Sequence, residues 1–282
     1  MQNGSKGMKI PLFQVDAFSP SPFGGNPAAV CLLEEFPSGA TMKNIAMEMN
    51  LSETAFVIPR DSGWKDDPDS FSIRWFTPTV EVPLCGHATL AASHVIFSEQ
   101  GKNGGRISFE SASGTLFAEL SMKGITLDFP ADRPVPAEQP AEVMAAMGIT
   151  GPEEVLIAKE ALMLLVRVGD EDTVRNLSPD FEAMLRADRG PEKYEGVIVT
   201  SPSGRYDFVS RYFGPWEGLN EDPVTGSAHT VLAPYWSGVT GKKDFSAFQA
   251  SRRGGELHLA LSGERVRISG PACVVLRGEL QI

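Results

Sequence analysis

Two short segments of the chain combine a turn, a glycine and reactive side chains at the start of a helix rich in small residues. They are VPLCGHATLAASHV at positions 82–95 and NEDPVTGSAHT at positions 220–230. The first amides of a helix have no intrahelical acceptor and carry the positive end of the dipole, so each start could hold an anion. Gly86 and Gly226 would let a ligand approach the backbone, and two such starts together could clamp a small carboxylate. The plainer interpretation is that both glycines only make tight turns into buried helices.

Acid–base groups accompany these helix starts. Cys85 directly precedes Gly86, where the dipole would favour the thiolate. Asp222, before Pro223, is interpreted as the equivalent residue in the other segment, where it could cap the helix or point into a cleft. His87 could donate or accept a proton near neutral pH. An inert buried cysteine, a capping aspartate and a structural histidine are the simpler interpretations of these residues.

Glu53, in the segment NLSETAF, lies just before the apolar run AFVIP. On composition alone it is an ordinary solvated glutamate. In a closed apolar cleft, burial would instead raise the pKa of its carboxyl toward the range of a general base. A metal site built from Cys85, His87, His94 and His229 has no recognised zinc spacing, so we expect no metal.

The elements that would position these residues suggest two related halves. The two helix starts, Gly86 and Gly226, are 140 residues apart in a chain of 282, which favours a duplicated unit and two lobes. The first half is predicted to be mostly β around one apolar helix at about 86–98. In the second half EVLIAKEALMLLVRV (154–168) is predicted as one strand, and the helix from Gly226 is expected to kink or end early at Pro234. The proline-rich segment 131–140 is the expected linker, and no nucleotide-binding fingerprint is present.

Composition excludes several classes of partner. Acidic residues outnumber basic ones 36 to 25, the net charge is −11, and no basic cluster exceeds two residues, so neither nucleic acid nor an anionic membrane is expected to bind. The longest strongly apolar run, ALMLLVRV, is too short to span a bilayer. Three cysteines fit a reducing cytoplasm better than a disulfide framework. The segment MQNGSKGMK lacks the apolar core of a secretion signal, and we expect residues 1–7 to be a loose tail or foreign to the native chain.

Five ordered motifs resemble those of the PhzF-like phenazine-biosynthesis family. They run from the amino-terminal strand to near the carboxyl end, and their order over almost the whole chain makes the likeness specific. The motifs are FGGNPAAV (23–30), NLSETAF (50–56), RWFTPTVEVPLCGHATLAA (74–92), EDPVTGSAH (221–229) and QASRRGGEL (249–257).

The resemblance implies a diaminopimelate-epimerase-like α+β fold. In that fold two pseudo-symmetric lobes each wrap a mostly antiparallel β-sheet around a central helix, and the active site lies in the cleft between them. The lobes would be residues 9–131 and 132–269, with the strand around 270–282 as a candidate to pack back onto the first lobe. A homodimer is also expected from the family.

The resemblance also implies cofactor-free proton transfer, as in the isomerisation of trans-2,3-dihydro-3-hydroxyanthranilate. Glu53 falls on the glutamate of the family's SET motif and would be the general acid and base. His87 and Asp222 match polar active-site partners. The substrate-binding positions that match are Asn26, Gly86, Gly226 and Ser227.

Two alternatives remain open at this point. Related amino-acid epimerases use two facing cysteines, whereas this chain has Cys85 at one such position and Asp222 at the other, so an epimerase or racemase using this mixed pair is conceivable. The chain could also be a relic of the fold that binds a metabolite or a protein without catalysis. The presence of Glu53, His87 and Asp222 together argues against a purely binding role.

Overall fold

The computed structural model describes residues 8–60, 69–99, 101 and 104–282, so the expected tail at residues 1–7 lies outside the described residues. The chain divides into two compact units. Unit 1 comprises Met1–Phe23, Pro27–Leu127 and Pro271–Ile282, and unit 2 comprises Gly24–Asn26 and Asp128–Gly270.

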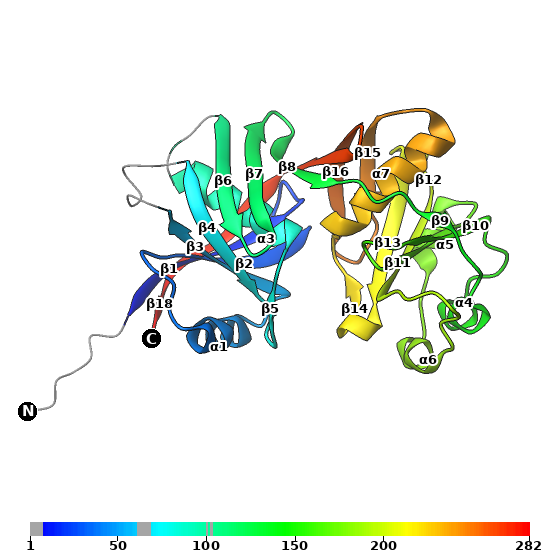
Figure 1. Ribbon diagram of the computed structural model, residues 1–282, viewed down its shortest axis with the longest axis horizontal. Coiled ribbons are helices and arrows are strands. Elements are labelled where there is room, and N and C mark those ends of the chain that lie inside the picture. The colour runs from blue at the N-terminus through cyan, green and yellow to red at the C-terminus, as the bar shows by residue number, and fades with distance from the viewer. Residues whose placement is uncertain (1–7, 61–68, 100, 102–103) are drawn as a thin grey trace, which may run out of the picture. The chain divides into compact units, whose positions relative to one another are not determined.

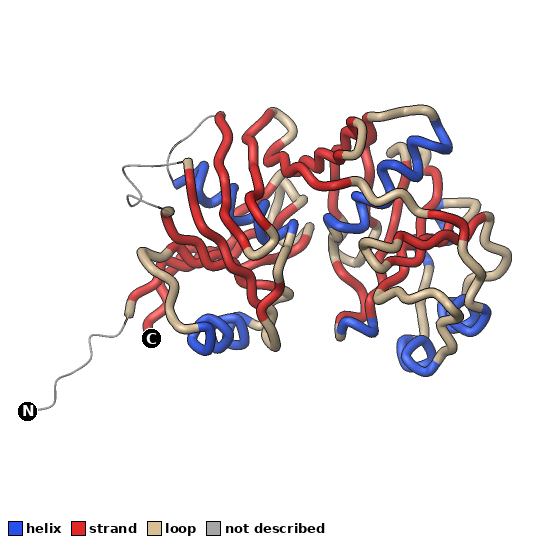
Figure 2. Tube along the Cα trace, viewed as in Figure 1, coloured by secondary structure: helices blue, strands red, loops and turns tan. Residues whose placement is uncertain are grey.

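Unit 1 consists of strands around one buried helix (Figures 1 and 2). Its elements are β1 (Lys9–Ala17), β2 (Asn26–Leu32), α1 (Gly39–Met49), β3 (Glu53–Pro59), β4 (Ser70–Phe76), β5 (Glu81–Val82), α3 (Gly86–Glu99), β6 (Gly105–Ser111), β7 (Gly114–Ser121), β8 (Gly124–Pro130) and the carboxyl-terminal β18 (Ala272–Gln281). The last residues of β8 belong to unit 2.

Unit 2 repeats this arrangement of strands around a central helix and adds short helices. Its elements are β9 (Val135–Pro136), α4 (Ala141–Met147), β10 (Glu154–Ala158), β11 (Met163–Arg167), α5 (Glu171–Asn176), α6 (Phe181–Arg186), β12 (Gly196–Pro202), β13 (Phe208–Gly214), the 3-10 turn η1 (Pro215–Glu217), β14 (Leu219–Asp222), α7 (Gly226–Thr240), β15 (Asp244–Gln249), β16 (Gly255–Ser262) and β17 (Arg265–Gly270).

The strand pairings show an internal repeat. In unit 1, β2 pairs parallel with β3, β3 pairs antiparallel with β4, and β4 pairs antiparallel with β5 and parallel with β6, followed by the β6–β7–β8 meander. In unit 2, β11, β12, β13, β14, β15, β16 and β17 pair in the same order and directions. The helix α3 follows β5 as α7 follows β14. The expected α+β organisation, two related halves each with a central helix, is therefore confirmed.

Both central helices are buried on nearly all sides, because small residues let the surrounding strands approach closely. In α3 every residue from His87 to Ser93 is buried, and the helix contacts β1, β3, β7 and β18. In α7 burial is similar, and the helix contacts β16 and β17. Each helix start is thus held in place by a packed core.

Two expectations for unit 2 were wrong, namely the early end of the helix at Pro234 and the single strand over 154–168. The helix α7 continues through Pro234 to Thr240. Proline removes the amide that would bond the carbonyl of Thr230, but the backbone amide of Asp132 donates to that carbonyl at 3.2 Å instead. The segment 154–168 forms a β10–β11 hairpin rather than one strand, because Leu162 takes a left-handed conformation (φ 52°) beside the polar turn.

Candidate active site

In unit 1 three candidate residues meet around the imidazole of His87. Glu53 is the first residue of β3, Cys85 directly precedes α3, and His87 is the second residue of that helix. The Oε2 atom of Glu53 lies 3.2 Å from Nε2 of His87. The Sγ atom of Cys85 lies 3.6 Å from Nδ1 of the same ring. The thiol and the carboxylate therefore lie beside the two ring nitrogens of one imidazole.

Burial sets the charge of this cluster. Because the folded protein removes the ring from water, the pKa of His87 falls to about 4, so the imidazole is neutral at pH 7. A neutral ring donates from one nitrogen and accepts at the other. With the proton on Nε2, His87 can accept from the thiol of Cys85. Nε2 lies beside Oε2 of Glu53 but outside hydrogen-bond geometry, so the neutral ring packs against that carboxylate without neutralising it.

In unit 2 the side chain of Asp222 accepts two hydrogen bonds. Asn26 Nδ2 donates to its Oδ1 at 2.8 Å, and Thr225 Oγ1 donates to its Oδ2 at 2.5 Å. Asn26 also donates to the carbonyl of Val224 at 2.9 Å, so one amide fixes both the carboxyl and the turn that follows it. Asp222 is 9% exposed and Asn26 is fully buried.

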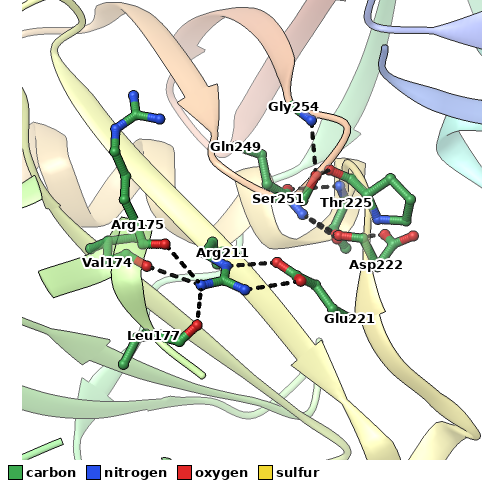
Figure 3. A network of polar contacts seen from close by, with 11 residues as sticks. Val174, Arg175, Leu177, Arg211, Glu221, Asp222, Thr225, Gln249, Ser251 and Gly254 are labelled. Atoms are coloured by element: carbon green, nitrogen blue, oxygen red, sulfur yellow. Dashed lines mark hydrogen bonds and ion pairs between the residues drawn. The ribbon is translucent and has the colours of Figure 1, made fainter. Parts of the chain in front are cut away.

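Gln249, at the end of β15, completes this network (Figure 3). Its Oε1 accepts the backbone amide of Thr225 at 2.8 Å. Its Nε2 donates to the carbonyl of Asp222 at 2.8 Å and to Thr225 Oγ1 at 3.1 Å. Gln249 and Thr225 were not predicted as site residues. Their signal in the sequence was that each lies within a motif of the family resemblance, although neither carries a charge.

Burial raises the pKa of Asp222 to about 7, and the hydrogen bonds from Thr225 and Asn26 limit the rise. The carboxyl is therefore about half protonated near neutral pH. An exposed aspartate has a pKa of about 3.9. Between about pH 3.9 and about pH 7, the carboxyl of Asp222 is mostly protonated in the folded protein and mostly ionised in the unfolded chain. The carboxyl therefore stabilises the fold at low pH and loses that contribution as pH rises through about 7.

We expect this titration to appear as a pH-dependent difference between wild type and Asp222→Asn. From pH 5 to pH 8, the free energy of unfolding of wild type should fall by about 2.5 kcal/mol relative to the variant, because asparagine does not ionise. Chemical denaturation at several pH values measures this difference. Parallel pH curves for the two proteins would show that Asp222 does not titrate in this range.

The two helix starts differ in their surroundings. Gly226 is buried, whereas the next residue, Ser227, is exposed. Gly86 is partly exposed, and the corresponding next residue, His87, is buried. The α7 start can therefore present its amides and the hydroxyl of Ser227 to an anion, whereas the α3 start places an acid–base group beside its amides.

The internal repeat corrects the assumed equivalence of Cys85 and Asp222. Asp222 pairs with Tyr212 as Val82 pairs with Trp75, and each helix begins four residues later. Thr225, not Asp222, therefore corresponds to Cys85. By the same registers the first residue of β12, Gly196, corresponds to Glu53.

Arg211 supports the strand that carries Asp222 (Figure 3). Its Nε and Nη2 donate to the two carboxylate oxygens of Glu221 at 2.6 and 3.0 Å. Its Nη1 donates to carbonyls at the end of α5, including that of Leu177 at 2.7 Å. Arg211 thus ties the residue next to Asp222 to the α5 terminus.

The structure places the predicted residues in two sets. Glu53, Cys85 and His87 lie together in unit 1, beside Gly86. The other predicted residues belong to unit 2 and are Asn26, Asp222, Gly226 and Ser227. Among the described residues, Glu53, Cys85 and His87 are grouped closely enough to share a metal ion, whereas His94 and His229 do not belong to that group. No helix within the described ranges has the length and apolar character needed to cross a membrane.

Comparison with known proteins gives consistent matches. A family model described as phenazine biosynthesis-like protein (PhzC-PhzF) matches residues 15–278. An uncharacterized isomerase of Pseudomonas aeruginosa is 45% identical over 275 residues, covering 98% of this chain and 100% of that protein.

Solved structures similar to this chain point to the same family and fold. The crystal structure of a PhzF-family phenazine biosynthesis protein from Enterococcus faecalis has a TM-score of 0.87 at 40% identity, covering 98% of this chain and 100% of that one. A predicted epimerase from Pseudomonas aeruginosa has a TM-score of 0.75 at 22% identity, covering 96% and 99%, and this shows a shared fold. The expected fold class is confirmed by these structures.

Proposed function

The chain belongs to the phenazine biosynthesis-like (PhzC-PhzF) family, and from this premise we propose that it is a cofactor-independent isomerase that moves a proton on a small carboxylate substrate. A relative that is 45% identical to this chain is an uncharacterized isomerase, which supports the reaction class. The chemistry would be similar to that of trans-2,3-dihydro-3-hydroxyanthranilate isomerase, with Glu53 as the general acid and base.

The observation that carries this proposal is the asymmetry of the repeat. Unit 1 has Glu53 beside His87, whereas unit 2 has Gly196 and Ser227 at the corresponding positions. A Cβ atom on Gly196 would lie 2.1 Å from Oη of Tyr212, so the second unit has no room for a carboxylate there. A single oriented carboxylate suits an isomerase in which one group removes a proton and returns it elsewhere.

In the proposed mechanism Glu53 accepts a proton from a substrate carbon, so that a C–H bond breaks and an O–H bond forms on the carboxyl group. The electron pair spreads over the conjugated substrate, and the same O–H then protonates a different carbon. His87 packs beside Glu53, with Nε2 3.2 Å from Oε2, and so limits the positions of the carboxyl during both steps. The reaction needs no oxidant or reductant.

The residues of unit 2 would bind the substrate. In this proposal the amides at the α7 start and the hydroxyl of Ser227 hold the substrate carboxylate. Asp222, with its raised pKa, can accept a hydrogen bond from a substrate amine or exchange a proton with it near neutral pH. Asn26 fixes the orientation of Asp222.

The proposal is tested by proton exchange in D₂O. The wild-type protein is incubated with dihydro-hydroxyanthranilate and a panel of amino and hydroxy acids, and NMR follows deuterium at each carbon. We expect deuterium at the carbon that is protonated in the product, together with movement of the double bond. Binding of a panel member, seen as a thermal shift, without exchange at any carbon would instead support a non-catalytic binding protein.

Replacement of Cys85 by alanine separates the isomerase from the epimerase alternative. We expect Cys85→Ala to reduce turnover by less than about tenfold, because the thiol contacts His87 but does not carry the substrate proton in the proposed mechanism. An epimerase using Cys85 would lose its activity completely. Thr225 at the position that corresponds to Cys85 argues against such a two-base mechanism, because a threonine hydroxyl does not ionise near neutral pH. Measurement of kcat and of exchange at the α-carbon distinguishes the two outcomes.

A further inference from the structure

We propose that Glu53, Cys85 and His87 form a binding site for a zinc-type divalent cation, and that the bound cation inhibits the enzyme. Their ligand atoms, one from each residue, all lie within 4.8 Å of one another. The binding step does not depend on the proposed function. Only its inhibitory effect rests on the assignment of Glu53 as the acid–base group.

The distances within the cluster are close to those between ligands of one zinc ion. Tetrahedral zinc, with Zn–S of about 2.3 Å and Zn–N of about 2.0 Å, places its sulfur and nitrogen ligands about 3.5 Å apart. The observed distance from Cys85 Sγ to His87 Nδ1 is 3.6 Å. Glu53 now lies against the other ring nitrogen, Nε2, so its carboxylate would have to turn toward Nδ1 to reach an ion held by Cys85 and Nδ1. Glu53 is the longest side chain of the three and is partly exposed, and the three ligand atoms already lie within 4.8 Å of one another.

The chemical types of the three ligands favour a borderline or soft cation. A thiolate and an imidazole select Zn²⁺ and related ions over Mg²⁺ and Ca²⁺, which prefer oxygen ligands. On binding, Cys85 releases its S–H proton to solvent, and the two anionic ligands, Cys85 and Glu53, then balance the two positive charges of the ion. This balance matters because an unpaired charge is costly in a site where the side chain of His87 is only 8% exposed.

The local fold favours this site. Cys85 and His87 flank Gly86 at the α3 start, and Glu53 comes from the beginning of β3, so all three ligands stand on packed elements. A fifth of the Glu53 side chain is exposed, which gives solvent access to the cluster. Three protein ligands leave a fourth position for water or a substrate group, as in open zinc sites.

Occupancy would stop the proposed reaction. A carboxylate oxygen coordinated to a cation has lost the lone pair that would accept the substrate proton. The same ion would hold His87 in one ring orientation through its bound nitrogen. The cell's available zinc would then set the fraction of active enzyme.

Metal titration of the full chain tests binding directly. Cd²⁺, a zinc substitute with a thiolate-to-metal absorption band, is titrated into reduced protein, and Zn²⁺ competition follows. We expect one ion per chain in wild type and at least about a hundredfold weaker binding in Cys85→Ser, since even an outer-shell change costs about 10–100-fold in affinity. Cys273→Ser removes a half-buried thiol outside the cluster and is the matched control, which should bind like wild type.

Thermal unfolding without metal shows whether each variant is folded. If Cys85→Ser does not fold, Glu53→Gln provides the second test, because its partly exposed side chain can be changed with little effect on the core. It should keep the absorption band but bind more weakly, by about tenfold or more. Absence of a thiolate band in wild type, or equal affinity in wild type and the cluster variants, would overturn the proposal.

Inhibition is measured separately from binding. If the wild-type protein catalyses exchange with a substrate of the panel, stoichiometric Zn²⁺ should abolish deuterium incorporation and a chelator should restore it. Binding of one ion with unchanged exchange would refute the inhibitory role. If no substrate supports exchange, the proposed function fails while the titration still decides whether the site binds metal.

Discussion

Glu53→Gln is expected to slow turnover by about 10²–10⁴-fold, the range that a positioned general acid or base contributes. Glutamine has nearly the same shape and can fill the same place beside His87, but it cannot take up a proton near neutral pH. The loss should therefore appear in kcat rather than in KM, and deuterium exchange into the substrate should fall by the same factor. Steady-state kinetics and NMR exchange measure the two effects.

Glu48→Gln is the control for this experiment. Glu48 is an exposed glutamate on α1, five residues before Glu53 but not a member of the Glu53–Cys85–His87 cluster, and its replacement should change neither rate nor exchange. Undiminished turnover in Glu53→Gln would remove Glu53 from the role of acid and base. A rise in KM alone would indicate that Glu53 binds substrate without transferring a proton.

Arg211→Met is expected to lower the free energy of unfolding by about 3 kcal/mol, because removal of one partner leaves the other charge of a poorly solvated pair uncompensated. The side chains of Arg211 and Glu221 are only 10% and 21% exposed. Methionine also removes the donors to the carbonyls at the end of α5. Denaturant unfolding measures the loss, and the double change Arg211→Met with Glu221→Leu should recover much of it.

Arg186→Gln provides the matched comparison for Arg211. Nη1 of Arg186 lies 3.5 Å from Oε2 of Glu182, and the side chains of the two residues are 71% and 85% exposed. Solvent screens such a pair, so its loss should cost less than about 0.5 kcal/mol. Equal effects of the two arginine replacements would show that the Arg211 clamp contributes little to folding.

The sequence predicted the fold class because both repeats carry the same local signals. Glycine before a run of small residues marks the start of α3 and of α7. The short helices α4, α5 and α6 were not predicted, because six or seven residues show too little periodicity. They form where Met144, Val174 and Met184 reach the unit 2 core, and this packing depends on residues distant in sequence.

The sequence also named candidate residues that the structure groups within each unit, but it did not predict their partners. His87 contacts Glu53, 34 positions away in the sequence, because α3 packs on β3. No local sequence pattern indicates this packing. The correspondence of Thr225 with Cys85 could be recognised only from the strand registers. The helix α7 does not end at Pro234, where the amide of Asp132, about a hundred residues earlier in the chain, replaces the lost hydrogen bond.

The pairing of β1 with β18 determines the order in which this chain can fold on the ribosome. Lys9 pairs with Gln281 and Ala17 with Ala272, so the first strand to be made waits for the last (Figure 1). At about 5–20 residues per second this wait lasts roughly 15–50 s, during which the edge of β1 that β18 will cover stays open to other strands. Residues of unit 2 from Asp128 to Gly270 emerge complete before that strand is available. The nascent chain is therefore expected to complete residues 128–270 of unit 2 before β1 can pair with β18.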